Sequence, residues 1–188
     1  MKVHFIHGLE SSPLGEKARY LAANFDTRTP HMDTSDLEGA MEIQRASIAA
    51  WRPDVVVGSS FGGAIAVALL GRGHWRGPTL LLARAAAKLG IHHPLPAGVP
   101  VTIVHGVHDA IVPIEDSRAL AKTGTPGLVE LLEVDDEHRL SRLVSPDAGR
   151  REGGGADASL GAFRSSGRSV SVPSLEELVR ELYARART

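Results

Sequence analysis

Residues 55–64 read Val-Val-Val-Gly-Ser-Ser-Phe-Gly-Gly-Ala, and this stretch decides the fold that the sequence predicts. Three consecutive valines are typical of a strand buried on both faces of a sheet. The apolar residues 64–70 that follow are long enough for two helical turns. Between them lies a Gly-x-Ser-x-Gly turn in which Ser60 is central and Gly58 and Gly62 flank it. Strand, turn and helix in this order predict a nucleophile elbow, which exposes a serine hydroxyl at the end of a strand.

The same turn has an alternative interpretation. A chain with 20 glycines in 188 residues produces such patterns by chance, so the motif alone also fits a Gly- and Ser-rich turn in another doubly wound protein. The strand before the turn and the helix after it are the context that an elbow requires. They favour Ser60 as the nucleophile over Ser59, which is not centred in the pattern.

The composition predicts a single globular domain over residues 1–188. Hydrophobic residues make up 43% of the chain, which is enough for a substantial core. The net charge of −1 gives no electrostatic reason to expect a nucleic acid or a membrane surface as a partner. The absence of cysteine excludes disulfides and thiolate chemistry.

The start of the chain predicts a cytoplasmic protein. Residues 1–8 become strand-like at once and lack the apolar core of a signal peptide. No apolar run in the sequence approaches the roughly 18 residues that a membrane span needs. We therefore expect neither secretion nor insertion into a bilayer.

Apolar patterning along the chain predicts alternating strands and helices. Strands are expected at residues 3–6, 25–29, 55–57, 79–83, 101–104 and 128–134. Helices are expected at residues 13–24, 37–51, 64–70, 114–122 and 174–185. The first of these helices is expected to have Ser12 as its N-cap and Pro13 in its first position. This alternation predicts an α/β fold with a mostly parallel sheet of about six strands and helices on both faces.

Three segments are expected to lie outside this regular pattern. Residues 84–100 contain three prolines and, with residues 33–37, are expected to border a pocket. Residues 145–172 are rich in Gly, Ser and Arg, a composition that buries too little apolar surface to offset its ordering entropy. We therefore expect a mobile insertion there, before the C-terminal helix.

The positions of several polar residues predict where chemistry takes place. In a parallel α/β sheet, active sites lie beyond the carboxyl ends of the strands. His7, Ser60, Asp109 and His138 each come shortly after a predicted strand. We therefore expect all four residues at one edge of the sheet.

Ser60, Asp109 and His138 supply the residue types of a hydrolytic triad, in the chain order Ser, Asp, His. A serine hydroxyl is a poor nucleophile unless a base removes its proton and a third group orients that base. In this interpretation His138 is the base and Asp109 is the orienting carboxylate. The backbone N–H groups of Leu9 and Phe61 are the expected donors to the oxyanion that forms on an acyl carbonyl.

Three motifs together resemble the α/β-hydrolase superfamily. They are His-Gly-Leu-Glu-Ser-Ser-Pro at residues 7–13, Gly-Ser-Ser-Phe-Gly-Gly at residues 58–63, and His-Gly-x-x-Asp-x-x-Val-Pro at residues 105–113. They are most similar to the small bacterial YqiA-type esterases, which pair such a His-Gly-x-x-Ser-Ser-Pro loop with a Gly-Ser-Ser-x-Gly-Gly elbow. The likeness covers about residues 1–143.

This resemblance implies a serine esterase without a large cap domain that acts on short or medium acyl esters. The chain departs from the family pattern at two places. Glu137 precedes His138, where a glycine is more usual, and residues 145–172 interrupt the run from the histidine to the last helix.

The single residues also have plainer interpretations. Asp109 fits an N-cap for the helix that follows it. His138 fits an exposed histidine at a helix start. His7, together with Gly8, is expected to support the oxyanion loop through a hydrogen bond rather than to take part in the chemistry.

Two histidine pairs raise the question of a metal ion. They are His92 with His93 and His105 with His108. Neither pair has the carboxylate and the third histidine that metal-site spacing requires, so we predict no metal and no cofactor.

The function that these residues favour is hydrolysis of small carboxylic esters through an acyl-enzyme intermediate. The same triad also serves thioesters, lactones and amides, and a hydrolase fold that has lost its activity is a binding module. The expected partner is therefore a small-molecule acyl ester, with no nucleic acid and no membrane. The sequence carries no signal for the oligomeric state.

Overall fold

The computed structural model describes residues 1–145, 162–164 and 169–188. In these ranges eight strands form one sheet in the order β2-β1-β3-β4-β5-β6-β7-β8. The strands are β1 (Lys2–Ile6), β2 (Asp26–Arg28), β3 (Val55–Ser59), β4 (Thr79–Leu82), β5 (Val101–Gly106), β6 (Val129–Val134), β7 (Ala162–Arg164) and β8 (Ser169–Val170). Strands β1 to β6 pair in parallel, and β7 and β8 pair antiparallel. The predicted α/β fold with a mostly parallel sheet is confirmed.

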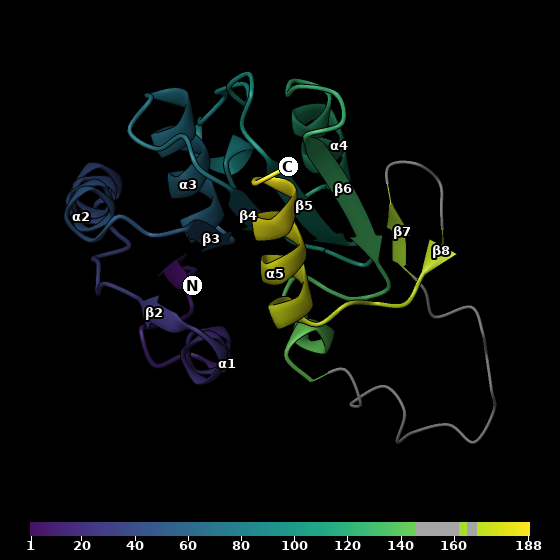
Figure 1. Cartoon of the computed structure of the whole chain (residues 1–188), viewed down its shortest axis with the longest axis horizontal. Helices are drawn as coiled ribbons and strands as arrows, with labels where there is room; N and C mark the ends of the chain where they lie inside the picture. Colours follow the sequence, from purple (N-terminus) through teal and green to yellow (C-terminus); the bar gives the residue numbers. More distant parts are fainter. Residues whose placement is uncertain (146–161, 165–168) are drawn as a thin grey trace.

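Helices cover both faces of this sheet (Figure 1). They are α1 (Glu16–Asn24), α2 (Leu37–Trp51), α3 (Phe61–Gly71), α4 (Ile114–Ala121) and α5 (Leu175–Arg185), with single 3-10 turns at Ala87–Leu89 and Ser141–Leu143. Helices α2, α3 and α4 share one buried apolar cluster with the sheet, and α1 and α5 share a second cluster. The sheet is therefore the middle layer of three.

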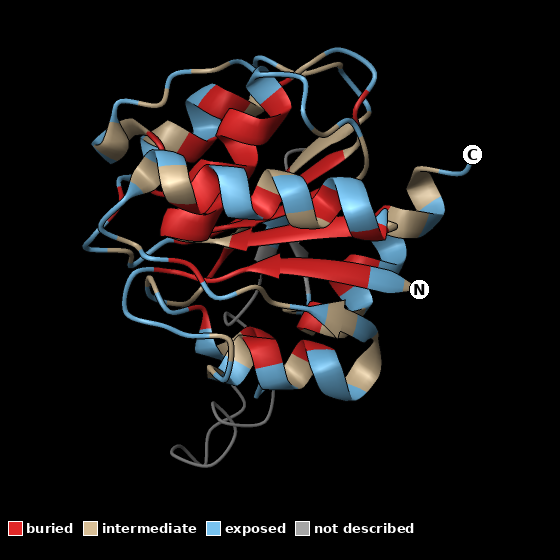
Figure 2. Ribbon diagram, turned by 90° about the vertical axis from the view of Figure 1, so that its left-hand side faces the viewer, coloured by how far each residue is buried: buried red, intermediate tan, exposed pale blue. Residues whose placement is uncertain are grey.

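The strands in the centre of the molecule are buried between the helices, as Figure 2 shows, and most of the buried residues are apolar. Strands β4 and β5 are buried along their entire length, and so is α3 from Phe61 to Leu70. Near-continuous apolar strands are typical of parallel sheets covered on both faces. Within the described ranges no helix combines the length and the apolar composition that crossing a bilayer needs.

Capping residues set two of the helix starts, one at its predicted position and one a single residue later. The Asp36 side chain accepts a hydrogen bond from the N–H of Gly39 (3.0 Å) at the start of α2. Ser174 and Glu177 form a reciprocal capping box at the start of α5. Such caps satisfy N–H groups that have no partner within the helix.

Two predicted helix starts were wrong. Helix α1 begins at Glu16 rather than near Pro13, because Ser12 caps a turn instead of the helix: its Oγ accepts from the N–H of Leu14 (3.2 Å). Leu14 is 76% exposed and does not belong to the core. Helix α3 begins earlier than predicted, at Phe61, because the elbow leads directly into it and its glycines pack too closely on the sheet for any larger residue.

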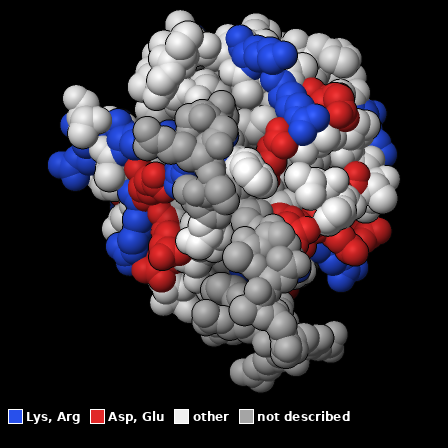
Figure 3. All heavy atoms as spheres, turned by 90° about the vertical axis from the view of Figure 1, so that its right-hand side faces the viewer, with Lys and Arg blue, Asp and Glu red and all other residues white. Residues whose placement is uncertain are grey.

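No strand was predicted after β6, so β7 and β8 are corrections to the predicted insertion. Strand β7 is stabilised by polar contacts, since Arg164 pairs with Glu130 and with Glu181 (3.0 Å). Figure 3 views this side of the molecule, where basic and acidic side chains lie interspersed on the described surface. The rest of the predicted insertion, residues 146–161 and 165–168, lies outside the described residues.

Candidate active site

Ser60 forms the turn between the end of β3 and the start of α3. It has φ 53° and ψ −113°, a backbone conformation that residues other than glycine rarely adopt. Its N–H donates to the carbonyl oxygen of Leu82 (2.8 Å), and its own carbonyl accepts from the N–H of Ala85 (3.1 Å). The end of β4 thus holds a strained turn in place, which is the backbone geometry of a nucleophile elbow.

The flanking glycines are required by close backbone contacts. A Cβ on Gly62 would lie 2.0 Å from the carbonyl oxygen of Ile6, at the end of β1. A Cβ on Gly58 would lie 2.6 Å from the carbonyl oxygen of Gly62. Both distances are far below van der Waals contact, so any side chain would push α3 away from the sheet. The Gly-x-Ser-x-Gly spacing therefore has a steric cause in this chain.

A chain of hydrogen bonds joins Ser60, His138 and Asp109, and we call these three side chains the serine relay. His138 Nε2 lies 2.9 Å from Ser60 Oγ, and His138 Nδ1 lies 2.7 Å from Asp109 Oδ2. A carboxylate only accepts, so Nδ1–H donates to Asp109 and the neutral ring leaves Nε2 to accept the Ser60 proton. The three residues predicted from strand ends are thus in mutual hydrogen-bond contact.

Asp109 is held by its own turn as well as by His138. Its Oδ1 accepts from the N–H groups of Ile111 and Val112, both at 2.8 Å, and its side chain is 1% exposed. Burial favours a raised pKa for this carboxyl, but the hydrogen bonds from Val112, His138 and Ile111 outweigh it and hold the pKa below its usual value. The interpretation of Asp109 as a helix N-cap is wrong, because Pro113 is the N-cap of α4.

The loop after β6 carries His138 to this position. Asp136 organises the loop: its Oδ1 accepts from the N–H of Glu137 (2.8 Å) and its Oδ2 from the N–H of Arg142 (2.9 Å). A Cβ on Gly106 would lie 2.3 Å from the carbonyl oxygen of Asp136, so the loop packs directly on the end of β5. Glu137 does not have a positive φ, so the glycine usual in the resembled family is not required there.

The loop after β1 passes next to the Ser60 side chain. A Cβ on Gly8 would lie 3.3 Å from the Ser60 Cβ and 4.0 Å from its Oγ. In the described part of the chain, neither the Leu9 N–H nor the Phe61 N–H has a protein acceptor. Phe61 is the first residue of α3, where N–H groups have no partner within the helix. The two predicted oxyanion donors are therefore free, one on each segment that borders Ser60.

His7 is buried in the same loop, with 2% of its surface exposed. Its Nδ1 donates to the carbonyl oxygen of Gly8 (2.9 Å), a carbonyl that also accepts from the N–H of Ser11 (3.2 Å). His7 makes no contact with the serine relay among these hydrogen bonds. It fixes the loop that carries Leu9.

A polar cavity of about 360 Å³ opens beside this loop. Its lining includes His7 and Leu9 on one side and the segment 31–34 on the other. His7 Nε2 is buried and has no hydrogen-bond partner among the described residues. The predicted border segment 33–37 therefore contributes Asp33 and Thr34 to the lining of this cavity.

Sequence reasoning missed the part played by His105, which it named only as the start of the motif at residues 105–113 and as half of a histidine pair. His105 is fully buried; its Nδ1 accepts from the Ser117 hydroxyl (2.7 Å), and its Nε2 donates to the carbonyl oxygen of Val112 (3.0 Å) and lies 3.3 Å from Asp109 Oδ2. Burial lowers the pKa of His105, so the ring stays neutral. The sequence feature that could have pointed to this role is the position of His105, directly before Gly106 at the end of an apolar strand.

The two histidines of the pair His105 and His108 lie in different surroundings. His105 faces the core, whereas His108 is exposed and pairs with Asp135 (2.8 Å). Across residues 1–145, 162–164 and 169–188, no three His, Cys, Asp or Glu side chains gather in a way that fits a metal ion.

Comparison with known proteins gives likeness in structure rather than in sequence. No protein-family model matches the chain, and no curated protein does so. A protein of Xanthomonas campestris pv. campestris assigned to the alpha/beta hydrolase superfamily is 25% identical, with a TM-score of 0.64 over 77% of this chain and 91% of that one.

Two further solved structures are more distant in sequence. An alpha-beta serine hydrolase homologue from Coxiella burnetii is 18% identical, with a TM-score of 0.54 over 80% of this chain and 85% of that one. The esterase domain of a Rhodothermus marinus protein is 16% identical, with a TM-score of 0.55 over 74% and 78%. Together with the parallel sheet and the elbow of this chain, these likenesses show that it has the α/β-hydrolase fold.

Proposed function

We propose that this protein is a serine hydrolase that cleaves small carboxylic esters through an acyl-enzyme intermediate. The observation that carries the proposal is the continuous serine relay, with 2.9 Å from Ser60 Oγ to His138 Nε2 and 2.7 Å from His138 Nδ1 to Asp109 Oδ2. It starts at a serine in the strained backbone of an elbow. The structural neighbours named as hydrolases and esterases support hydrolysis as the class of reaction.

In the proposed reaction, Ser60 Oγ attacks the ester carbonyl while His138 Nε2 takes the hydroxyl proton. The carbonyl oxygen becomes an oxyanion that accepts from the N–H groups of Leu9 and Phe61. His138 then returns the proton to the leaving alcohol, and Ser60 is left acylated. Water attacks this acyl-enzyme with His138 again as the base, which releases the acid and restores the serine. Asp109 keeps the imidazole in the required tautomer and stabilises the imidazolium form.

The cavity beside the Leu9 loop is the proposed place for part of the substrate. It is lined by polar groups, including His7, Ser11 and Ser12, and it adjoins the segment that carries the oxyanion donor. No side chain of the serine relay lines it, and its volume of about 360 Å³ lies at the small end of the range for ligand pockets, which suits a small substrate group.

A fluorophosphonate probe, which reacts with activated serines, tests the proposal directly. Wild type is expected to gain one probe adduct by intact-mass analysis, and Ser60→Ala none. Ser59→Ala is the matched control, since Ser59 is adjacent but belongs to β3, and it is expected to label like wild type. Equal labelling of wild type and Ser60→Ala, or no labelling of wild type, would rule out Ser60 as the nucleophile.

The leaving group is tested separately. Turnover of p-nitrophenyl esters is compared with that of acyl-CoA of the same acyl length, and with a lactone and an amide of similar size. Faster turnover of the oxygen ester supports the esterase proposal, and faster turnover of acyl-CoA identifies a thioesterase with the same relay. A binding module would form no adduct with an activated ester at all.

A further inference from the structure

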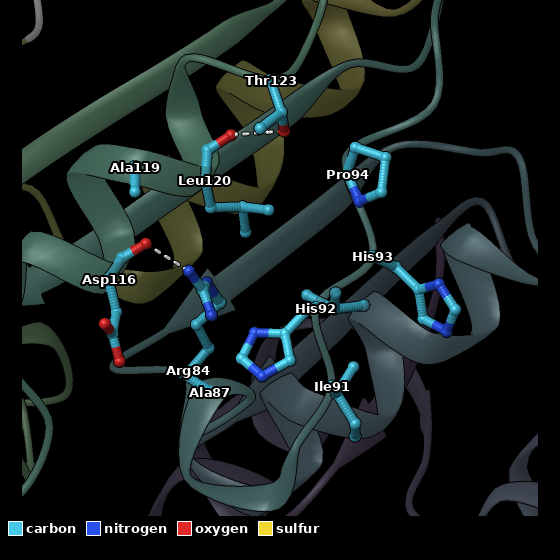
Figure 4. Close-up of a pocket in the computed structure, with 11 residues that line it drawn as sticks. Arg84, Ala87, Ile91, His92, His93, Pro94, Asp116, Ala119, Leu120 and Thr123 are labelled. Carbon is cyan, nitrogen blue, oxygen red and sulfur yellow. Dashed lines mark hydrogen bonds between the residues drawn. The ribbon is translucent and has the colours of Figure 1, made fainter.

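A second cavity, of about 230 Å³, lies between α3, α4 and the segment 84–94 that follows β4 (Figure 4). No side chain of the serine relay lines it. Much of its wall is apolar, formed by residues such as Val67 on α3, Leu120 on α4 and Ile91. Two charged side chains also line this space, the guanidinium of Arg84 and the carboxylate of Asp116.

Arg84 is only 5% exposed, and arginines are rarely buried this deeply without a carboxylate partner. In the part of the chain that the structure describes, its hydrogen bonding is limited to Nη2 donating to the backbone carbonyl of Asp116, and Nε has no partner. The Asp116 carboxylate forms no ion pair with Arg84 and points away from the guanidinium in Figure 4. Since a guanidinium has five N–H donors, most of them are unused.

The charge of Arg84 is therefore incompletely balanced. Burial lowers the pKa of its guanidinium, and the negative charge of Asp116 offsets only part of this effect. The rings of His92 and His93 also line the cavity and bring no negative charge (Figure 4). An anion that enters the cavity would pair with the unused donors and stabilise the buried charge.

The backbone fixes the position from which the Arg84 side chain extends. The preceding residue, Ala83, has a positive φ of 44°. A Cβ on Gly63 would lie 2.8 Å from the Arg84 Cβ, so the first turn of α3 packs directly on Arg84. The following N–H, that of Ala85, donates to the Ser60 carbonyl. A guanidinium held in this way binds an anion with little loss of side-chain freedom.

We propose that this cavity is a binding site for a small organic carboxylate. The carboxylate group pairs with the fork of N–H donors on Arg84, for which its geometry is matched. The apolar body of the ligand packs against Val67, Ile91 and Leu120. The cavity offers one guanidinium, and the Asp116 carboxylate also lines it, so a singly charged ligand suits it better than inorganic phosphate, whose second charge would have no partner. The site is separate from the reaction proposed for Ser60 and does not depend on it.

Isothermal titration calorimetry with sodium benzoate tests the proposal, with benzamide as the neutral ligand of the same shape and inorganic phosphate as the competing anion. Wild type is expected to bind benzoate at one site. Benzamide is expected to bind at least about tenfold more weakly because it carries no charge to pair with Arg84, and phosphate at least about tenfold more weakly because its second charge has no partner. Arg84→Met, which keeps the length of the side chain, is expected to weaken benzoate binding by about tenfold or more. Arg45→Met, at an exposed arginine paired with Glu42, is the control and is expected to bind benzoate like wild type.

A second variant keeps the test decisive if Arg84→Met does not fold. Ala119→Phe places a larger side chain in the lining from the outer face of α4 and leaves Arg84 unchanged, so it is expected to weaken benzoate binding to a similar degree. Benzoate binding that persists in Arg84→Met and in Ala119→Phe, or benzamide binding as tight as benzoate binding, would overturn the proposal. Tighter binding of phosphate than of benzoate would overturn the choice of ligand. Ser60→Ala is expected to bind benzoate like wild type, so a failure of this proposal is distinct from a failure of the proposed reaction.

Discussion

Replacing Asp109 by asparagine changes one atom and reverses the direction of a hydrogen bond. In the structure Asp109 Oδ1 accepts from two N–H groups, those of Ile111 and Val112 at 2.8 Å, and Oδ2 accepts from His138 Nδ1 at 2.7 Å. An asparagine has one oxygen and one NH2 group. The two N–H groups require the oxygen on their side, so the NH2 group is turned toward His138.

The reversed hydrogen bond changes which ring nitrogen of the neutral His138 imidazole carries the proton. An NH2 group donates to Nδ1, so the neutral ring must carry its proton on Nε2, the nitrogen that lies 2.9 Å from Ser60 Oγ. In this tautomer His138 has no lone pair with which to take the serine proton. Loss of the correct tautomer in a Ser-His-Asp triad lowers kcat by about 10⁴-fold, which corresponds to about 5 kcal/mol in the activation free energy.

The assay is kcat for hydrolysis of a p-nitrophenyl ester by Asp109→Asn, with the free energy of unfolding measured alongside. Stability is expected to fall modestly at neutral pH: the amide oxygen keeps both backbone contacts, but the ionised carboxylate, whose pKa is lowered in the folded protein, is lost. Asp135→Asn is the matched control, since Asp135 also binds a histidine, His108 at 2.8 Å, but away from Ser60. A loss of kcat below about tenfold in Asp109→Asn, or an equal loss in the control, would refute this account of the relay.

Two further predictions concern the fold that holds the relay. His4 is buried and its Nε2 donates to Gln44 (2.7 Å), and burial lowers its pKa to about 4 despite this bond. The unfolded chain therefore binds more protons between about pH 6.5 and pH 4, and the free energy of unfolding is expected to fall by up to about 3 kcal/mol as pH drops through this window. Urea denaturation of His4→Leu should show a shallower fall, and an unchanged pH slope would contradict the assignment. Gly62→Ala, whose Cβ would meet the Ile6 carbonyl at 2.0 Å, is expected to destabilise the protein by about 1–3 kcal/mol and to abolish ester turnover, and wild-type stability and activity in this variant would contradict the steric argument.

The elbow was predictable because its determinants are local. Three valines, two glycines around Ser60 and an apolar run specify strand, turn and helix within residues 55–71, and close backbone contacts explain the glycines. The order of strands then brings Asp109 and His138 to the same edge, because parallel strands end on one side of the sheet. Local sequence and a general rule of topology together were sufficient here.

Other features depend on contacts between distant segments, which no local pattern encodes. Strand β7 lies in a Gly-, Ser- and Arg-rich stretch, and its pairing with β6 is accompanied by contacts of Arg164 with Glu130 and Glu181. Ser12 followed by Pro13 is typical of a helix start, yet the Ser12 hydroxyl accepts from the N–H of Leu14 in a turn that precedes the helix. The sequence likewise does not indicate that Arg84 is buried with an unpaired Nε, because it is one of many arginines in the chain.

The most direct test of the central claim is to trap the acyl-enzyme. The reaction with p-nitrophenyl acetate is quenched in acid within the first turnovers, and the protein is examined by intact mass and peptide mapping. We predict one acetyl group, located on Ser60 and absent from Ser60→Ala. An acetyl group on another residue, or rapid release of p-nitrophenol with no acetylated protein at any quench time, would contradict the claim that Ser60 carries the acyl group.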